Sequence, residues 1–430
     1  MNTLLGAQRR NTELGLLLMA GVLTAGAYTL AGLGRSASLP ANLVPFLLII
    51  LGLLAVAHVA TRRLAPSADG ILLPLAGLLN GVGYVFIARL DSDLAGLQAM
   101  WTALGVGAFV ATLLVVRRAR DIERLRYTFA LAGCALLLMP LLPGIGRNIN
   151  GARLWVRLGA LTFQPGELAK IALCIFFASY LVEKQPLLAM GTRKVAGVWV
   201  PNVRHFGPIV LAWAFSLVVM FWERDLGSSL LFFALFITLL WVATARGAYL
   251  GIGGVMFAGG AYIAWSVFDH VKTRISILAD PWSVATGAGY QTVQALFAFA
   301  AGGLTGTNIG QGSPQRIPAV STDFIFAAIG EELGLLGTVA VLVAFLLMVG
   351  AGLRIAMRVE SPFEKLLATG LTAIIGLQTF IILGGVTRLV PLTGITLPFV
   401  SYGGSSLVSN YILLALLLRI SDDHHERAGA

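Results

Sequence analysis

The sequence is poor in charged residues. Only 12% of its 430 residues are Asp, Glu, Lys or Arg, whereas 57% are hydrophobic. Soluble domains carry roughly 25% charged residues, so this scarcity excludes an ordinary soluble globular protein. A chain this apolar is typical of a polytopic membrane protein, for which domain number cannot be estimated from length.

Cysteine is scarce as well. The two cysteines, Cys134 and Cys174, both lie inside apolar segments. Cysteine in such a position behaves as a small hydrophobic residue in a packed helix. The two residues therefore give no information about the redox compartment of the protein.

Several motifs of soluble enzymes are missing. The chain has no phosphate-binding glycine loop ending in Lys-Ser/Thr, no His-Glu-x-x-His and no Cys-x-x-Cys. The glycines from Gly302 to Gly312 therefore indicate a loop, not a dinucleotide-binding fingerprint. His424 and His425 lie in a short polar tail, where we expect a disordered end, with metal binding as the alternative. No repeat, low-complexity tract or coiled-coil pattern is visible.

What the chain has in abundance is apolar stretches of membrane-spanning length. A helix needs about 17–25 residues to cross a bilayer, and the 50 glycines suit close helix packing in lipid. We expect the first stretch to be an anchor and not a cleavable signal peptide, because it is long and another stretch soon follows. The sequence predicts an all-α bundle of about twelve transmembrane helices, near 14–33, 43–60, 71–88, 98–116, 127–142, 167–182, 207–222, 226–243, 247–268, 324–352, 366–386 and 403–420.

The distribution of positive charge predicts the orientation. The net charge is +10, and with a cytoplasmic N-terminus most Lys and Arg residues fall in inner loops. This bias favours a cytoplasmic location for both termini. Some cations remain on the outer side, either as ordinary solvated charges or as ligands of an anionic group. They are Arg147, Arg153, Arg157, Lys170, Arg224, Lys272, Arg274, Arg316 and Arg388, among others.

One acid stands where a long loop becomes a helix. The longest stretch between two predicted spans runs from Asp269 to Asp323, and an apolar run begins directly afterwards. A charge at a helix centre in lipid costs roughly 2.5–3.5 kcal/mol, so we expect Asp323 at the membrane surface. It is either a helix cap or a functional acid. Glu331 and Glu332 lie further along the same helix and need partners or water.

Two other positions have local explanations. Glu167 and Lys170 are three residues apart, share a helical face and are expected to pair. Asp225 opens a predicted span, and because Asp is a favoured N-cap, a cap and a functional role remain equally open. The segment 390–406 contains two prolines and a Gly pair. Such a break at membrane depth predicts a loop buried in protein or beside a cavity.

Taken together, these segments resemble the SEDS family, the RodA- and FtsW-like peptidoglycan polymerases. The resemblance covers about residues 71–420 and rests on Gly151–Trp155, Phe163–Lys170, Asp225–Ser228, Asp280–Trp282, Gly289–Gln291, Thr322–Ala327, Glu331–Gly334 and Pro391–Ser405. It implies a ten-helix core over 71–420 with a large extracellular loop before the Thr-Asp-Phe-Ile-Phe helix. Two extra N-terminal helices would occupy residues 1–70, and a short cytoplasmic tail residues 421–430.

The resemblance also implies a function. It suggests a glycosyltransferase that polymerises lipid II into glycan strands at the outer face of the cytoplasmic membrane, in elongation or division. The expected partners are a class B penicillin-binding protein, lipid II and membrane lipids, but no nucleic acid. No cofactor is evident, although a divalent cation (Mg²⁺ or Mn²⁺) stays open. The alternatives are a lipid II flippase, which needs polar groups through both leaflets, and a non-catalytic scaffold, which needs no acid at the loop–helix junction.

Motif by motif, the resemblance assigns roles to residues. The family's essential acid falls on Asp323, which would act as general base toward a sugar hydroxyl. Cations would stabilise the charge that develops on a leaving pyrophosphate. The expected substrate-binding residues are Arg153, Trp155, Glu167, Lys170, Asp225, Lys272, Arg274, Arg316 and Ser401. The chain has Leu154, Ala319 and Ser321 where the family has Arg, Glu and His. Asp323 is therefore the one acid in its motif.

Overall fold

The structure is a computed structural model that describes most of the chain. It describes residues 2–39, 43–149, 152–159, 161–189, 191–195, 198–201, 210, 214–215, 217, 219, 221–223 and 225–429. The chain forms two compact units. The first comprises Met1–Arg117, Arg274–Ile355 and Gln378–Ala430, and the second comprises Arg118–Thr273 and Ala356–Leu377.

Among the described residues, eleven helices are long and apolar enough to cross a membrane. They are Arg10–Arg35, Leu43–Leu64, Leu72–Leu90, Ser92–Val115, Ala119–Leu141, Gly166–Leu188, Leu226–Thr244, Ala248–Val267, Ile325–Arg358, Pro362–Val386 and Gly404–Arg427. They confirm the predicted helical membrane fold and eleven of its twelve spans. The remaining prediction, 207–222, falls largely outside the described residues.

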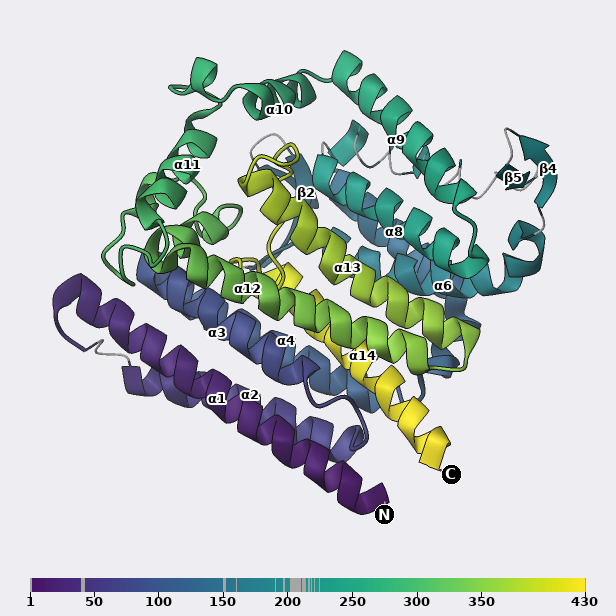
Figure 1. Ribbon diagram of the computed structural model, residues 1–430, viewed down its shortest axis with the longest axis horizontal. Coiled ribbons are helices and arrows are strands. Elements are labelled where there is room, and N and C mark those ends of the chain that lie inside the picture. Colours follow the sequence, from purple (N-terminus) through teal and green to yellow (C-terminus); the bar gives the residue numbers. More distant parts are fainter. Residues whose placement is uncertain are drawn as a thin grey trace. The chain divides into compact units, whose positions relative to one another are not determined.

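The first unit is a bundle of long helices (Figure 1). Its elements are α1 (Asn2–Ser36), α2 (Leu43–Leu64), α3 (Leu72–Leu90), α4 (Ser92–Val115), α11 (Tyr290–Gly302), η5 (Pro314–Arg316), α12 (Ile325–Arg358) up to residue 355, and α14 (Gly404–Gly429). α4 packs on α14 because Gly105 leaves room for Tyr411: an added Cβ would lie 2.6 Å from its ring. Asn80 of α3 donates to the Tyr411 hydroxyl at 3.1 Å.

The two N-terminal helices belong to this bundle. Tyr28 of α1, Phe46 of α2 and Tyr84 of α3 form an aromatic cluster in which Phe46 lies 4.3 Å, centroid to centroid, from each of the other two rings. Near the opposite end of α1, the buried Glu13 pairs with Arg10 and lies 2.7 Å from His58 Nδ1. The segment predicted as two extra helices therefore packs as part of the same unit as α3 and α4.

The two termini lie at the same end of the first unit, and the loop that precedes α12 lies at the other end (Figure 1). α14 continues through Gly429, so the expectation of a disordered tail is wrong for the described residues. Asp422 explains why: it accepts from Ser67 N at 2.7 Å and pairs with Arg419 at 3.1 Å. Among the described residues, no group of three His, Cys, Asp or Glu side chains is placed to hold a metal ion.

The second unit combines helices with two small sheets. Its helices are η1 (Ala119–Leu125), α5 (Arg126–Leu138), η2 (Met139–Leu141), α6 (Gly166–Ala189), α8 (Leu226–Thr244) and α9 (Ala248–Val267), and α5, α6, α8 and α9 pack consecutively. Two helices begin in the second unit and end in the first: α10 (Asp269–Ala279) and α13 (Pro362–Val386). The short helix η4 (Trp282–Val284) follows α10 and belongs to the first unit.

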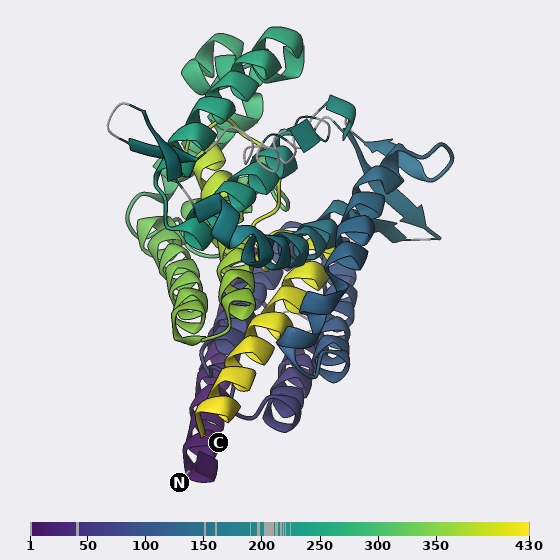
Figure 2. The same ribbon diagram turned by 90° about the vertical axis from the view of Figure 1, so that its right-hand side faces the viewer.

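The sheets were not predicted from the sequence. One is antiparallel with strand order β1 (Gly146–Ile149), β2 (Ala152–Leu158), β3 (Leu161–Phe163), and the other is the hairpin of β4 (Gly191–Val195) and β5 (Val198–Pro201) (Figure 2). The signal for β2 was present, because Leu154, Val156 and Leu158 alternate with more polar residues. That period of two is typical of a strand.

Candidate active site around Asp323

Asp323 lies in a tight turn immediately before α12. The backbone N–H groups of Thr322 and Asp323 both donate to the carbonyl of Ala319, at 3.2 and 3.1 Å, and Ala319 has a left-handed φ of 52°. Gln291 of α11 donates to the carbonyl of Pro318 at 2.6 Å. The structure therefore places Asp323 at the junction of loop and helix, as predicted.

A second loop fixes the backbone of this turn. The buried Ser401 donates to the carbonyl of Thr322 at 2.5 Å and accepts from Leu397 N at 2.9 Å. Tyr402 N donates to the carbonyl of Ser321 at 2.8 Å. The Pro391–Ser405 segment, predicted to break the helix, thus holds the two residues before Asp323. A substrate contact for Ser401 stays a prediction.

The same segment borders the carboxylate itself. Gly394 has a φ of +76°, and a Cβ added to it would lie 3.6 Å from Asp323 Oδ2 and 3.9 Å from Arg274 Nη2. Arg274 Nη1 donates to the carbonyl of Leu392 at 2.7 Å. The carboxylate and the guanidinium therefore both lie within 4 Å of the position that a Cβ on residue 394 would occupy, and glycine leaves that position free.

The surroundings of Asp323 change its acidity. Its side chain is neither fully buried nor fully exposed. Burial raises the pKa of Asp323 to about 6, while the hydrogen bond with Thr322 and the positive charge of Arg274 lower it. Burial dominates because loss of water disfavours the charged form. A carboxyl with such a pKa can both take up and release a proton near neutral pH.

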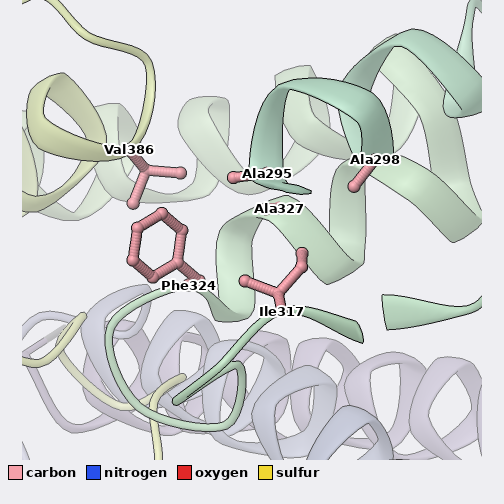
Figure 3. Close-up of a cluster of buried hydrophobic side chains, with 6 residues drawn as sticks. All are labelled: Ala295, Ala298, Ile317, Phe324, Ala327 and Val386. Carbon is pink, nitrogen blue, oxygen red and sulfur yellow. The ribbon is translucent and has the colours of Figure 1, made fainter. Parts of the chain in front are cut away.

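An apolar cluster supports the turn from behind. Phe324, the residue after Asp323, is fully buried, and its ring points toward Val386 (Figure 3). The two share a cluster with Ala295, Ala298, Ile317 and Ala327. α11 packs closely on α12 because both helices have glycine at the contact: a Cβ on Gly302 of α11 would lie 1.9 Å from the carbonyl oxygen of Gly330 of α12. The turn is thus anchored on two packed helices.

The span predicted near 324–352 is present as α12, but it is broken at Gly334, which the sequence did not predict. Gly334 has φ 65° and ψ −163°, so a short helical piece, 325–333, precedes the long one. The freed N–H groups of Leu335 and Leu336 donate to the carbonyls of Gly303 and Leu304, at 2.9 and 3.2 Å. The loop after α11 thereby satisfies backbone groups that lipid cannot satisfy.

Glu331 and Glu332 hold that loop in place. Glu332 is completely buried, its Oε1 lies 2.5 Å from Arg89 Nε, and its Oε2 accepts from Gly310 N at 3.0 Å. Glu331 accepts from Ser313 N at 2.7 Å. The expectation that these acids need partners is confirmed, and the partners come from α3 and from the loop.

The expected site residues fall in both units. Asp323, Arg274, Arg316 and Ser401 lie in the first unit, and Arg153, Trp155, Glu167, Lys170, Asp225 and Lys272 lie in the second. In the first unit the structure brings Asp323 and Arg274 together, and Ser401 bonds to the neighbouring turn. Arg316 is exposed at the end of η5.

In the second unit, two local predictions are confirmed. Lys170 Nζ lies 2.6 Å from Glu167 Oε2, and both residues are buried. Asp225 is the N-cap of α8 and accepts from Ser228 N at 3.0 Å, which is one of the two roles left open for it. The cap does not exclude the other role.

The remaining three residues of the second unit are more accessible. Arg153 is exposed on β2, and Trp155 on the same strand is half-buried. Lys272 is exposed and pairs with Asp269 of the same helix at 3.0 Å. Their accessibility leaves them able to meet a ligand.

Two residues were missed as site residues, one that borders Asp323 and one that holds the helix of Arg274. Gly394 borders the carboxylate, and its signal was the Thr-Gly pair inside a proline-rich break. Arg388 was noted only as an outer cation. It donates to the carbonyls of Leu278 and Ala279, at 2.8 and 3.2 Å, and so ties the end of α10, the helix of Arg274, to the loop that carries Gly394.

Comparison with known proteins shows the family to which this chain belongs. The model of the FtsW/RodA/SpoVE cell cycle protein family matches residues 85–426. The chain belongs to this family. The predicted SEDS resemblance is thereby confirmed, and the match begins after α1 and α2.

Curated relatives of the FtsW/RodA/SpoVE family extend the comparison. The peptidoglycan glycosyltransferase RodA of Mycobacterium tuberculosis (strain ATCC 25618 / H37Rv) is 44% identical over 424 residues, covering 96% of this chain and 90% of the relative. A probable peptidoglycan glycosyltransferase FtsW of Geobacter metallireducens is 33% identical over 343 residues, covering 79% of this chain and 85% of the relative. The mycobacterial match therefore includes most of the N-terminal helices.

Solved structures of this family have the same fold. A chain from a peptidoglycan synthase complex that coordinates polymerization and crosslinking aligns with a TM-score of 0.68 and 26% identity, covering 84% of this chain and 99% of that one. The crystal structure of the rod shape determining protein RodA of Thermus thermophilus aligns with a TM-score of 0.59 and 26% identity, covering 84% and 98%.

Proposed function

We propose that Asp323 is the general base with which this protein joins lipid II units into glycan strands. The protein is a multi-pass membrane protein and, as a member of its family, a peptidoglycan glycosyltransferase. The assignment to Asp323 is supported by one observation above all. A carboxyl whose pKa is raised to about 6 and the guanidinium of Arg274 both lie within 4 Å of the Cβ position that Gly394 leaves free.

The proposed step is a displacement at an anomeric carbon. The hydroxyl oxygen of the acceptor sugar forms a bond to that carbon, and its proton passes to the carboxylate of Asp323. The bond to the pyrophosphate breaks, and the leaving group takes the electron pair. The raised pKa makes the carboxylate a stronger base, and because about 6 still lies below neutral pH, Asp323 afterwards releases the proton to water.

Arg274 is the cation that we place beside the reacting groups. Its Nη1 is held by the carbonyl of Leu392, which aims the guanidinium, and its Nη2 borders the space next to Gly394. A fixed positive charge there stabilises negative charge that develops on the leaving group. A divalent ion carried by the pyrophosphate is compatible with this arrangement, because Mg²⁺ is commonly bound by one or two carboxylates together with substrate phosphates.

Further substrate contacts are proposed from accessibility. Arg153, Trp155, Lys272 and Arg316 are exposed or half-buried, as ligand-binding groups must be before the ligand arrives. Lys170 is buried and its charge is compensated by Glu167, so we assign that pair and the Asp225 cap to positioning of their helices.

We propose that the termini are cytoplasmic, that the protein lies in the cytoplasmic membrane and that Asp323 lies at its outer face. The positive-inside bias supports this orientation. We also propose a class B penicillin-binding protein as partner, which is supported by the structural similarity to a chain of a peptidoglycan synthase complex. The identity of 44% with RodA, against 33% with FtsW, supports a role in cell shape and elongation.

The test is polymerisation of purified lipid II by the purified protein with its partner. Asp323→Ala is expected to lower the rate by about 10²–10⁴-fold, the usual contribution of a general base. Asp280→Ala is the matched control, because this acid lies upstream in the same loop region and, within the described part of the chain, its carboxylate accepts from Trp282 N at 3.0 Å. It should polymerise at the wild-type rate.

Three results would contradict the proposal in different ways. Wild-type rates from Asp323→Ala would remove the base assignment. Transfer of lipid II across vesicle membranes without polymer would favour the flippase. Neither activity in the wild-type complex, with an active partner, would favour the scaffold.

A further inference from the structure

A cavity of about 460 Å³ lies in the first unit where α1 ends. One wall is α1, with Leu30, Leu33 and Gly34, and the others are the loop after α11 and the α12 residues just before the break at Gly334. Figure 1 shows the end of α1 beside this loop. The volume falls within the range of about 300–1,000 Å³ that is usual for small-molecule sites.

The wall formed by α1 packs tightly against the loop after α11. A Cβ added to Gly34 would lie 2.2 Å from the carbonyl oxygen of Ile309, and one added to Gly310 would lie 2.6 Å from that of Ala31. Backbone meets backbone at both points. The α1 wall is therefore held by close backbone contact with the loop, and the cavity does not result from loose packing of α1.

One side of the cavity is lined by apolar, solvent-accessible side chains. Leu30 and Leu33 are 56% and 43% exposed, and Leu304, which precedes the lining residue Thr305, is 62% exposed. α1 is one of the candidate membrane spans, so exposed leucines on it face hydrocarbon. This side suits the acyl chains of a lipid.

The other side carries hydrogen-bonding groups without an uncompensated charge. The lining there includes the hydroxyl of Thr305, the amides of Asn308 and Gln311, and Glu332. The charge of Glu332 is compensated by Arg89. Amides and a hydroxyl offer donors and acceptors together, which suits sugar or glycerol hydroxyls better than a phosphate or an ammonium group.

We propose that this cavity binds a membrane lipid with a neutral, hydroxyl-bearing headgroup. The acyl chains would lie along Leu30 and Leu33, and the headgroup would bond to Asn308 and Gln311. The α1 wall lies outside residues 85–426, the region matched by the family model, whereas the other lining residues lie inside it. The inference does not depend on the role of Asp323, which is not a lining residue of the cavity.

The test uses the full-length protein in nanodiscs and a fluorescent glucosyl diacylglycerol as probe. Leu33→Trp fills the cavity, and we expect it to weaken probe binding about tenfold. Leu23→Trp is the matched control, because Leu23 is a 52% exposed leucine of the same helix that does not line the cavity. It should bind the probe as the wild type does.

A second variant guards against misfolding of the first. Asn308 has a φ of 77°, so Asn308→Gly removes the amide while keeping a backbone conformation that glycine adopts readily. We expect this variant also to weaken probe binding about tenfold. Asp323→Ala should bind the probe normally, which separates this inference from the proposed catalytic role.

Competition distinguishes the headgroup chemistries. Unlabelled glucosyl diacylglycerol should displace the probe, whereas phosphatidylglycerol and lipid II should not. Displacement by phosphatidylglycerol would show an anionic-lipid site, for which the exposed Arg35 beside Gly34 is the nearest cation along the chain. Displacement by lipid II would show a substrate site. Either result, or equal probe binding by all variants, would overturn the proposal.

Discussion

Asp323 and Glu332 are two acids on either end of the same short helical piece, and their surroundings are opposite. Glu332 is completely buried, paired with Arg89 and bonded to Gly310 N. Asp323 is partly exposed and, together with Arg274, lies within 4 Å of the Cβ position that Gly394 leaves free. Both residues are carboxylic acids in or just before the first turns of the candidate membrane span Ile325–Arg358. The difference shows that an acid whose bonds are already made holds structure, whereas one with an open side is available for chemistry.

The largest effect on stability should come from replacing Glu332, the acid that holds structure. Glu332→Ala leaves Arg89 buried without its partner and Gly310 N without its acceptor. Removing one member of a buried pair usually costs about 3–5 kcal/mol. We expect a clear fall in the unfolding temperature of the purified protein, while Asp323→Ala unfolds close to the wild-type temperature.

A double variant sharpens this contrast. Replacing both members, Arg89→Leu with Glu332→Leu, removes the unpaired charge and should recover part of the loss, because apolar replacement of a buried pair is often tolerated. An unchanged unfolding temperature in Glu332→Ala would contradict the structural role of this acid.

The second prediction concerns the space beside Asp323. In Gly394→Ala the new methyl group would lie 3.6 Å from Oδ2, an ordinary contact that occupies the space without a clash. We expect polymerisation to fall about 100-fold, the size of effect seen when reacting groups are displaced by about 1 Å. The measurement is the rate of glycan synthesis from lipid II.

The control for that variant is Gly144→Ala. Gly144 has a φ of +83°, close to the +76° of Gly394, but nothing lies within 4 Å of an added Cβ. Both substitutions strain the backbone similarly, and only one fills the site. Equal losses in the two variants would mean that backbone strain, not occupation of the space, causes the effect.

The sequence predicted the parts of this molecule that depend on local chemistry. Helical spans follow from apolar length, because lipid leaves the backbone no partner but itself. The Glu167–Lys170 pair follows from a spacing of three. The junction at Asp323 follows from the change from polar loop to apolar run.

Other features depend on residues far apart in the chain and could not be predicted. Nothing local to Glu332 points to Arg89, which comes from α3, and nothing near Asp323 points to Gly394. The break at Gly334 was hidden because the apolar run continues on both sides of it. Its partners, the carbonyls of Gly303 and Leu304, belong to another segment.

The smallest expected effect is a shift in pH dependence. Arg274 lowers the pKa of Asp323, so Arg274→Gln should move the midpoint of the pH–rate profile upward from about 6, in addition to slowing the reaction. The direction follows because loss of a nearby positive charge makes the carboxylate harder to form. An unchanged midpoint would show that the charge of Arg274 does not affect the pKa of Asp323.

The most direct test of the central claim is the pH dependence of kcat/KM for the wild-type protein, because it reports the ionisation of the free enzyme. A general base acts only when deprotonated, and burial raises the pKa of Asp323 to about 6. We predict that kcat/KM rises with pH up to about 6 and is level above it. A profile that is flat across this range would contradict a role for Asp323 as the base.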